Sequence, residues 1–219
     1  MLYMRSVAEG DRTARAVIRD EALRLFAVRG PEGVTVRQIA EAAGVSAALV
    51  VHHFGSKDGL RQEVDQYVLD VFEGMLGELA GEDGARLVEP GASSGLLSEV
   101  FGRYLPEGSP LPGYLRRLLL GDSEAGRKVF QRLFELSRGA LDGLVAGGVA
   151  VAGRDAEVRA AFLLANDLAV FLLRDRIAET LGVDPLSGDG MARWGAEMLS
   201  VYAGGLRASP PEGPAAGPS

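Results

Sequence analysis

Apolar residues recur every three or four positions along most of this chain, and strict alternation of apolar and polar residues is almost absent. A repeat of three to four places apolar side chains on one face of an α-helix, whereas a half-buried strand repeats every second residue. Residues that favour helices, namely alanine, leucine, arginine and glutamate, are abundant. We therefore predict an all-α protein with an N-terminal three-helix helix-turn-helix head and a C-terminal helical bundle body.

The N-terminal part of the chain predicts short helices separated by glycine-containing breaks. After a loose arm over residues 1–10, the predicted helices cover residues 12–28, 36–43, 47–53 and 57–79. Residues suited to N-cap positions precede three of them, namely Thr35, Ser46 and Ser56. The breaks contain Gly30-Pro31, Gly44 and Gly55, where glycine permits a left-handed backbone.

The rest of the chain predicts a larger helical part that follows a linker rich in glycine and charge at residues 80–90. The expected helices cover residues 93–105, 113–120, 123–146, 155–181 and 189–206. The tail, residues 208–219, consists of Pro, Gly, Ala and Ser apart from Glu212, so we expect it to be disordered. We divide the chain into a head (1–62), a body (63–207) and this tail.

The charge distribution separates the head from the body. The net charge is −7, which by itself argues against a nucleic-acid binder. Residues 1–62, however, carry nine basic and seven acidic residues, against fourteen basic and twenty-three acidic residues in the remainder. A mildly basic head on an acidic body can approach phosphates with one end only.

Composition narrows the possible chemistry. The absence of cysteine excludes disulfides, thiolate metal sites and cysteine catalysis. The first fifteen residues contain no long apolar segment, and no uncharged apolar stretch of about 18 residues occurs, so we expect no signal peptide, no membrane span and a cytoplasmic protein. A helical enzyme is disfavoured because catalytic triads, phosphate-binding glycine loops and metal-ligand clusters are missing. We expect no cofactor and no metal.

The segment Thr35–Leu60 carries the functional signal. Two short helices joined by a turn that contains Gly44 form a helix-turn-helix pattern. We expect Val45 to fill the turn, and Val50 and Phe54 to anchor the second helix on the first helix of the head. The residues left facing outward are then Ala47, Ala48, Leu49 and His52. The first residues of such a recognition helix meet base edges in the major groove.

This segment resembles the DNA-binding domain of TetR-family regulators. The family pattern is matched by Thr35, Val36, Arg37, Ile39, Ala40, Ala43, Gly44, Val45, Ser46, Phe54, Ser56, Lys57 and Leu60. Upstream, the family's first-helix pattern is matched by Ala22, Leu25, Phe26 and Gly30. The resemblance covers about residues 12–62. It implies a homodimer, a palindromic double-stranded DNA operator and a small-molecule effector, of unknown identity, held in the body.

The resemblance also assigns expected DNA contacts. Thr35 and Arg37 are expected to touch phosphate or base, whereas Ser46 and Lys57 are expected to hold phosphates, Ser46 together with the amide ends of the two short helices. The full set of predicted DNA-binding residues is Thr35, Arg37, Ser46, Ala47, Ala48, Leu49, His52, His53 and Lys57.

The recognition helix departs from the family pattern in several places, and His53 stands where tyrosine or histidine occurs. Ala47 stands where a lysine is frequent, and Val51 stands where a phosphate-binding tyrosine is usual. We therefore expect weaker non-specific binding, or compensation by Arg5, Arg12 or Arg15, although the first-helix arginines form mainly a solvated face. Leu49 is our candidate for packing on a thymine methyl group.

The two histidines, His52 and His53, point about 100° apart on a helix and have no cysteine nearby. We therefore favour a DNA contact for at least one of them over a packing role, and a packing role over a shared metal.

The body leaves several alternatives open. The stretch from Ala161 to Gly182 is apolar on most sides, and with residues 191–206 it would form half of a four-helix dimer interface by the family resemblance. Three charges interrupt it and could be interface ion pairs, pocket groups or exposed residues: Asp167, Arg174 and Asp175. The aromatic residues could form plain core or line a pocket: Tyr104, Tyr114, Phe130, Phe134, Phe162, Phe171 and Trp194.

The most favoured function is a repressor that its ligand releases from DNA. In this hypothesis the effector changes the tilt of the helix after Ser56, and the tilt changes the distance between the two heads of the dimer. Two recognition helices must lie about 34–36 Å apart to reach successive major grooves. The alternatives are a helical interaction scaffold without DNA binding and, least favoured, a helical enzyme.

Overall fold

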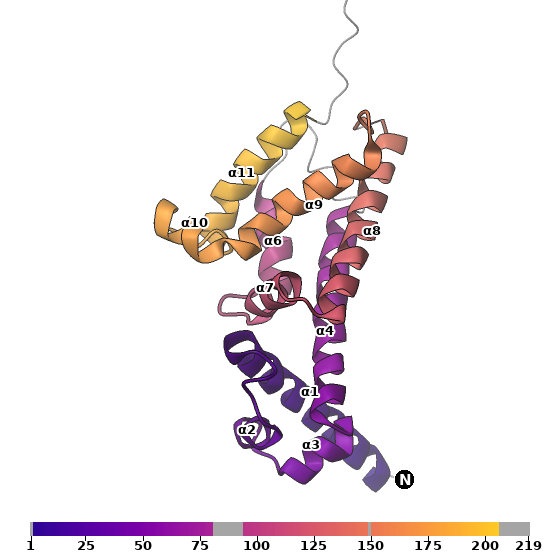
Figure 1. Ribbon diagram of the computed structural model, residues 1–219, viewed down its shortest axis with the longest axis vertical. Helices are drawn as coiled ribbons and strands as arrows, with labels where there is room; N and C mark the ends of the chain where they lie inside the picture. The colour runs from indigo at the N-terminus through magenta and orange to yellow at the C-terminus, as the bar shows by residue number, and fades with distance from the viewer. Residues whose placement is uncertain (1, 81–93, 149, 206–219) are drawn as a thin grey trace, which may run out of the picture.

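The computed structural model describes residues 2–80, 94–148 and 150–205, and these residues form helices and connecting loops with no strand, which confirms the all-α prediction (Figure 1). The helices are α1 (Leu2–Arg29), α2 (Val36–Ala42), α3 (Ala47–Phe54), α4 (Lys57–Ala80), α6 (Ser94–Tyr104), α7 (Leu111–Leu120), α8 (Glu124–Ala146), α9 (Ala156–Leu172), α10 (Arg174–Leu181) and α11 (Gly188–Gly205). The predicted linker (apart from Ala80, in α4) and the predicted tail lie outside the described residues.

The N-terminal arm is helical, so the prediction of a loose arm over residues 1–10 is wrong: α1 begins at Leu2. This segment contains no proline, and six of its ten residues are Met, Leu, Arg, Ala or Glu, which favour helices. Extending an existing helix fixes one residue for each new hydrogen bond, and it therefore avoids the cost of starting a helix. The downstream part of α1 supplies that start.

The predicted helix over residues 155–181 is two helices, because the chain bends at Leu173 between α9 and α10. The bend lets Arg174 reach Asp184, which accepts hydrogen bonds from both its Nε and Nη2 atoms. Another boundary differs at α7, which starts at Leu111 and includes Pro112, where Gly113 was expected. Proline is tolerated there because the first-turn amides have no helical acceptor.

Figure 1 shows an elongated molecule with α2 and α3 at its lower end and α9, α10 and α11 in its upper part. Helix α4 runs upward from α3 and packs beside α8, while α6 packs against α11 and α7 against α1. A single cluster of buried apolar residues extends from Ile18 in α1 to Phe171 in α9. Helix α4 also spans the predicted boundary between residues 62 and 63, which therefore stays a prediction.

The junction between the head and the body is formed by α7. Phe26 of α1 is fully buried and stacks on Tyr114 of α7, with ring centroids 6.3 Å apart. The Tyr114 hydroxyl donates a hydrogen bond of 2.6 Å to Oδ1 of Asp65 in α4. Burial raises the pKa of the Asp65 carboxyl and that of the Tyr114 phenol above their ordinary values. Thus one helix of the body contacts both α1 and α4.

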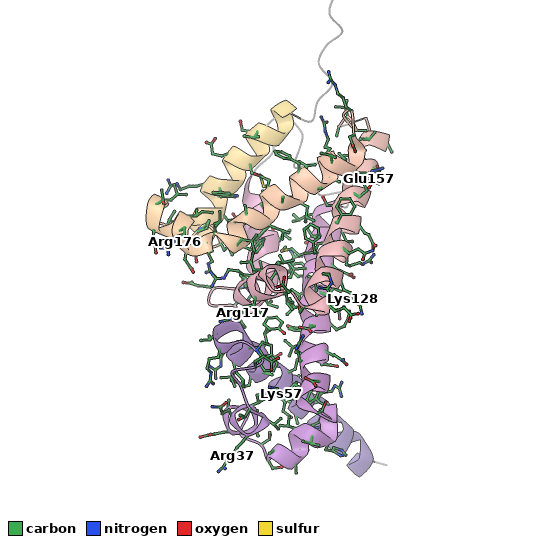
Figure 2. The ribbon with its side chains drawn as sticks, in the orientation of Figure 1. Arg37, Lys57, Arg117, Lys128, Glu157 and Arg176 are labelled. Atoms are coloured by element: carbon green, nitrogen blue, oxygen red, sulfur yellow. The ribbon has the colours of Figure 1, made fainter. Side chains whose placement is uncertain are left out.

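A second contact of α7 reaches the carbonyl end of α1. Nε of Arg117 donates a 2.7 Å hydrogen bond to the Ala27 carbonyl, and Nη2 donates to the Val28 carbonyl. The last carbonyls of a helix have no partner within it, so a cation there is favourable both as a donor and as a charge. Figure 2 shows Arg117 at the level where α7 meets the head.

The polar and aromatic residues singled out in the body have mixed positions. Tyr114 and Phe171 are buried core residues, whereas Phe130 and Phe162 are exposed. The prediction that each aromatic residue belongs to the core or lines a pocket is therefore wrong for Phe130 and Phe162 within one protomer. The reason is that both lie on helix faces that no described element covers. Asp175 is exposed and pairs at 3.0 Å with Arg116 of α7. Among the described residues, no helix is long and apolar enough to cross a membrane.

Candidate DNA interface

The turn between α2 and α3 is built by local side-chain hydrogen bonds. Thr35 caps α2 by accepting from the Gln38 amide at 3.2 Å, while the Gln38 side chain accepts from the Thr35 amide at 2.9 Å. Ser46 caps α3 by accepting from the Leu49 amide at 3.1 Å. Gly44 has φ +66°, a backbone conformation that disfavours any residue with a Cβ atom. The predicted caps and left-handed turn are confirmed.

The inner face of α3 is fixed in the core of the head. Val50 and Phe54 are buried, with relative exposures of 1% and 9%, and pack in the same apolar cluster as Ile39 and Ala40 of α2. Val45 packs against this cluster from the turn. The expected anchoring of the second short helix is confirmed, and it leaves the opposite face of α3 directed to solvent.

The outer face of α3 is apolar and uncovered. Ala47, Ala48 and His52 are exposed as predicted, but Leu49 is half-buried. Val51, by contrast, is 47% exposed and is among the exposed large apolar side chains of the molecule. Residues 47–54 include no Arg, Lys, Asp or Glu. Figure 1 places this helix at the lower end, away from the body.

The two cations predicted to contact DNA differ in their surroundings. Arg37 is exposed on α2, and within the described part of the chain its side chain makes no ion pair or hydrogen bond. Figure 2 shows Arg37 extending from the lower end of the molecule. Lys57 is half-buried, and its ammonium donates to the carbonyls of Pro31 at 3.1 Å and Val34 at 3.4 Å. Its phosphate contact stays a prediction, and its contacts here secure the loop before α2 to the start of α4.

Arg15, one of the three arginines expected to compensate, already has partners within the protein. Arg15 donates to Glu63 at 2.7 Å and to the His53 carbonyl at 2.9 Å, and its guanidinium lies 4.7 Å from the Phe54 ring centroid. These contacts join α1 to α3 and α4. The side chains of Arg5 and Arg12 lie outside the described ones. Helix periodicity could not reveal the pair of Arg15 and Glu63, because the two residues are 48 positions apart.

The histidine pair does not form one surface. His52 is exposed, whereas His53 is half-buried behind it, with the two ring centroids 5.5 Å apart. The His53 ring also lies edge-on to Phe54 at 6.1 Å. His52 is therefore accessible to a ligand, whereas His53 packs against Phe54, which anchors α3 in the core. The DNA contacts of both histidines stay predictions.

Removing the α3 cap is expected to weaken the head. Ser46→Ala should lower the free energy of unfolding by about 1 kcal/mol, because the Leu49 amide loses its acceptor at the helix start. Denaturant unfolding measures this change. Ser200→Ala, on the exposed surface of α11, is the matched control and should change stability by less than about 0.5 kcal/mol. Equal stability of the two variants would show that the cap contributes nothing.

Comparisons with known proteins point to one family. The sequence model described as "Bacterial regulatory proteins, tetR family" matches residues 18–64, the region that contains α2, α3 and the start of α4. The HTH-type transcriptional regulatory protein RaaS of Mycobacterium tuberculosis is 36% identical over 163 residues, which is 74% of this chain and 72% of RaaS. The HTH-type transcriptional repressor AcnR of Corynebacterium glutamicum is 37% identical over 99 residues, covering 44% of this chain and 45% of AcnR.

Solved structures share the fold. SmeT, the repressor of the Stenotrophomonas maltophilia multidrug efflux pump SmeDEF, superposes with a TM-score of 0.63 at 21% identity, covering 89% of this chain and 91% of SmeT. The TetR-family protein CprB of Streptomyces coelicolor, solved in complex with its operator sequence, gives a TM-score of 0.60 at 22% identity, covering 90% of each chain. The similarity therefore extends over the body as well as the helix-turn-helix segment.

Proposed function

Because this chain belongs to the TetR family of bacterial regulatory proteins, we propose that it is a repressor that binds a palindromic operator as a homodimer and is released by a small-molecule effector. As a member of this family it is a DNA-binding transcriptional regulator and not an enzyme. In the proposal, residues 1–62 bind DNA, and residues 63–207 dimerise and hold the effector. The protein acts in the cytoplasm, where its operator is.

The observation that carries the proposal is the uncovered outer face of α3, at the end of the molecule farthest from α9 and α11. Its inner face is held by Val50 and Phe54, so the helix can enter the major groove without losing its attachment. Arg37 and the amide ends of α2 and α3 lie beside it as donors for phosphates. CprB, which has the same fold, has been solved with its operator.

Exposed apolar side chains on the body support the homodimer. Phe162 of α9 is 68% exposed, and the exposed Val158 lies one helical turn before it. Val201 of α11 is also exposed. Large exposed apolar side chains such as these are typical of a surface that a partner covers. A second copy would bury them through the same patch on both protomers.

The contacts of α7 support coupling between the body and the head. Tyr114 contacts α1 and α4, and Arg117 holds the end of α1. An effector that displaced α7 would therefore move α1 together with α4. Because the two recognition helices must lie about 34–36 Å apart, a small change in head position would weaken operator binding.

The decisive experiment is selection of bound duplexes from a random DNA library at two salt concentrations. We expect an inverted repeat, because two identical heads related by a two-fold axis read two identical half-sites. Recovery of no sequence above background at either salt concentration would favour a helical interaction scaffold over a regulator. The selected operator then serves to screen effectors by loss of binding.

Arg37→Ala is expected to weaken operator binding about tenfold for all operator sequences and to reduce the salt dependence of binding by about one counterion per head. A cation that contacts phosphate adds affinity without sequence preference. Fluorescence anisotropy at several salt concentrations measures both effects. Arg154→Ala, an exposed arginine between α8 and α9, is the matched control and should leave binding unchanged. Equal behaviour of the two variants would exclude a DNA contact for Arg37.

A further inference from the structure

We infer that the outer face of α3 reads its operator mainly through the 5-methyl groups of thymines, with Val51 as the principal contact. This inference rests on the proposed operator binding. The sequence alone suggested Leu49 for this contact. We assign it to Val51 instead, because Leu49 is half-buried in the structure and Val51 is exposed.

The geometry assigns Val51 to the DNA-facing surface. Val51 lies three and four positions after Ala48 and Ala47, so all three share one face of α3. All three are exposed, Val51 with 47% of its surface. Rotating the helix to bury Val51 would require removing Val50 and Phe54 from the core. The apolar surface is therefore held outward by the same packing that fixes the helix.

The chemistry of this face limits what it can recognise. Base edges in the major groove are usually distinguished by hydrogen bonds from Arg, Lys, Asn, Gln, Asp, Glu, Ser or Thr. Residues 47–54 contain none of these, and His52 is the exposed residue of α3 with a polar side-chain atom. Ser46, just before the helix, accepts from the Leu49 amide, and its O–H remains the donor for the phosphate contact predicted above. The remaining base feature that an alanine and valine surface can recognise is the thymine methyl group.

The size of the face supports the same ligand. Ala47 and Ala48 extend a single methyl group from the helix, so the backbone can approach the groove closely. Val51 extends two methyl groups and lies one turn further along the helix. Together they match a groove floor on which thymine methyl groups project, whereas a guanine or cytosine edge would lose hydrogen bonds to water without gaining a partner.

The test uses the selected operator and replaces its thymines by deoxyuridine, which keeps the base pairing and removes the methyl group. We expect each contacted thymine to lose about fourfold in affinity when replaced, the effect of one apolar carbon. Deoxyuridine in the flanking sequence, outside the region protected by the protein, is the control and should change nothing. Val51→Ala removes two methyl groups, so it should weaken binding to the thymine operator by at least about fourfold and have little effect on the deoxyuridine operator.

The two substitutions together locate the contact. If Val51 touches the methyl group, the losses from Val51→Ala and from deoxyuridine are not additive, as in a double-mutant cycle. Val28→Ala is the matched control, because Val28 is also an exposed valine, on α1, and its truncation should affect binding to neither operator.

Three outcomes would overturn the inference while leaving operator binding intact: a half-site without thymine, full affinity for the deoxyuridine operator, or equal losses from Val51→Ala on both operators. Failure of the protein to select any DNA would instead overturn the proposed function.

Discussion

Replacing Phe162 with glutamate is expected to convert the proposed homodimer into a monomer and to weaken operator binding by about two to four orders of magnitude. Phe162 extends from α9 with 68% of its surface exposed, one helical turn after the exposed Val158, on the helix face proposed as the interface. A carboxylate there would have to be buried without a partner when two protomers meet. A monomer would bind each half-site separately and would lose the increase in operator affinity that comes from linking two heads.

Light scattering coupled to size exclusion measures the oligomeric state, and an operator titration measures the affinity. Phe130→Glu is the matched control, because Phe130 is an exposed phenylalanine on α8, outside the proposed interface. We expect this control to remain dimeric and to bind with normal affinity. A Phe162→Glu protein that stayed dimeric would remove α9 from the interface, and a wild-type monomer would remove the homodimer from the proposal.

Replacing Phe26 with alanine is expected to lower the free energy of unfolding by about 3–5 kcal/mol. The Phe26 side chain is fully buried and lies where α1, α4 and α7 meet, stacked on Tyr114. Truncation removes buried apolar area and leaves a cavity that the surrounding helices cannot fully close. Because the apolar core is continuous across this junction, the loss should destabilise the head and the body together.

Denaturant unfolding followed by circular dichroism and by Trp194 fluorescence measures the change. Trp194 lies in α11 and reports on the body, whereas circular dichroism averages all helices. We expect both signals to shift to the same lower midpoint. Phe130→Ala, on the exposed surface, should change stability by less than about 0.5 kcal/mol. A loss below about 1 kcal/mol for Phe26→Ala would contradict the assigned packing.

The elements of the head could be predicted because their signals are local. Thr35 and Ser46 are caps whose partners lie three residues away, and Gly44 is required by its own backbone conformation. Val50 and Phe54 follow helical spacing into the core. Each of these features depends on a few neighbouring residues, so a pattern in the sequence is enough to indicate it.

The misplaced features depend on distant residues. The break at Leu173 accompanies the pairing of Arg174 with Asp184, and no periodicity indicates which charges will meet across a loop. The relative exposure of Leu49 and Val51 likewise depends on how α3 is seated on the rest of the head, which fixes the rotation of the helix about its axis. Helical spacing puts Val51 on the same face as Ala47 and Ala48, and the family tyrosine at this position is consistent with that face.

The contact of Arg117 with the end of α1 makes the DNA-binding end depend on the body. The donors that satisfy the Ala27 and Val28 carbonyls come from a helix about 90 residues later in the chain. A fragment of residues 1–62 would lack Arg117 and also Tyr114, so the last turn of α1 would face water and Phe26 would lose its stacking partner. We therefore expect that the head does not fold as an autonomous module. A chain truncated before α7 should therefore bind its operator poorly even though every predicted DNA contact is present.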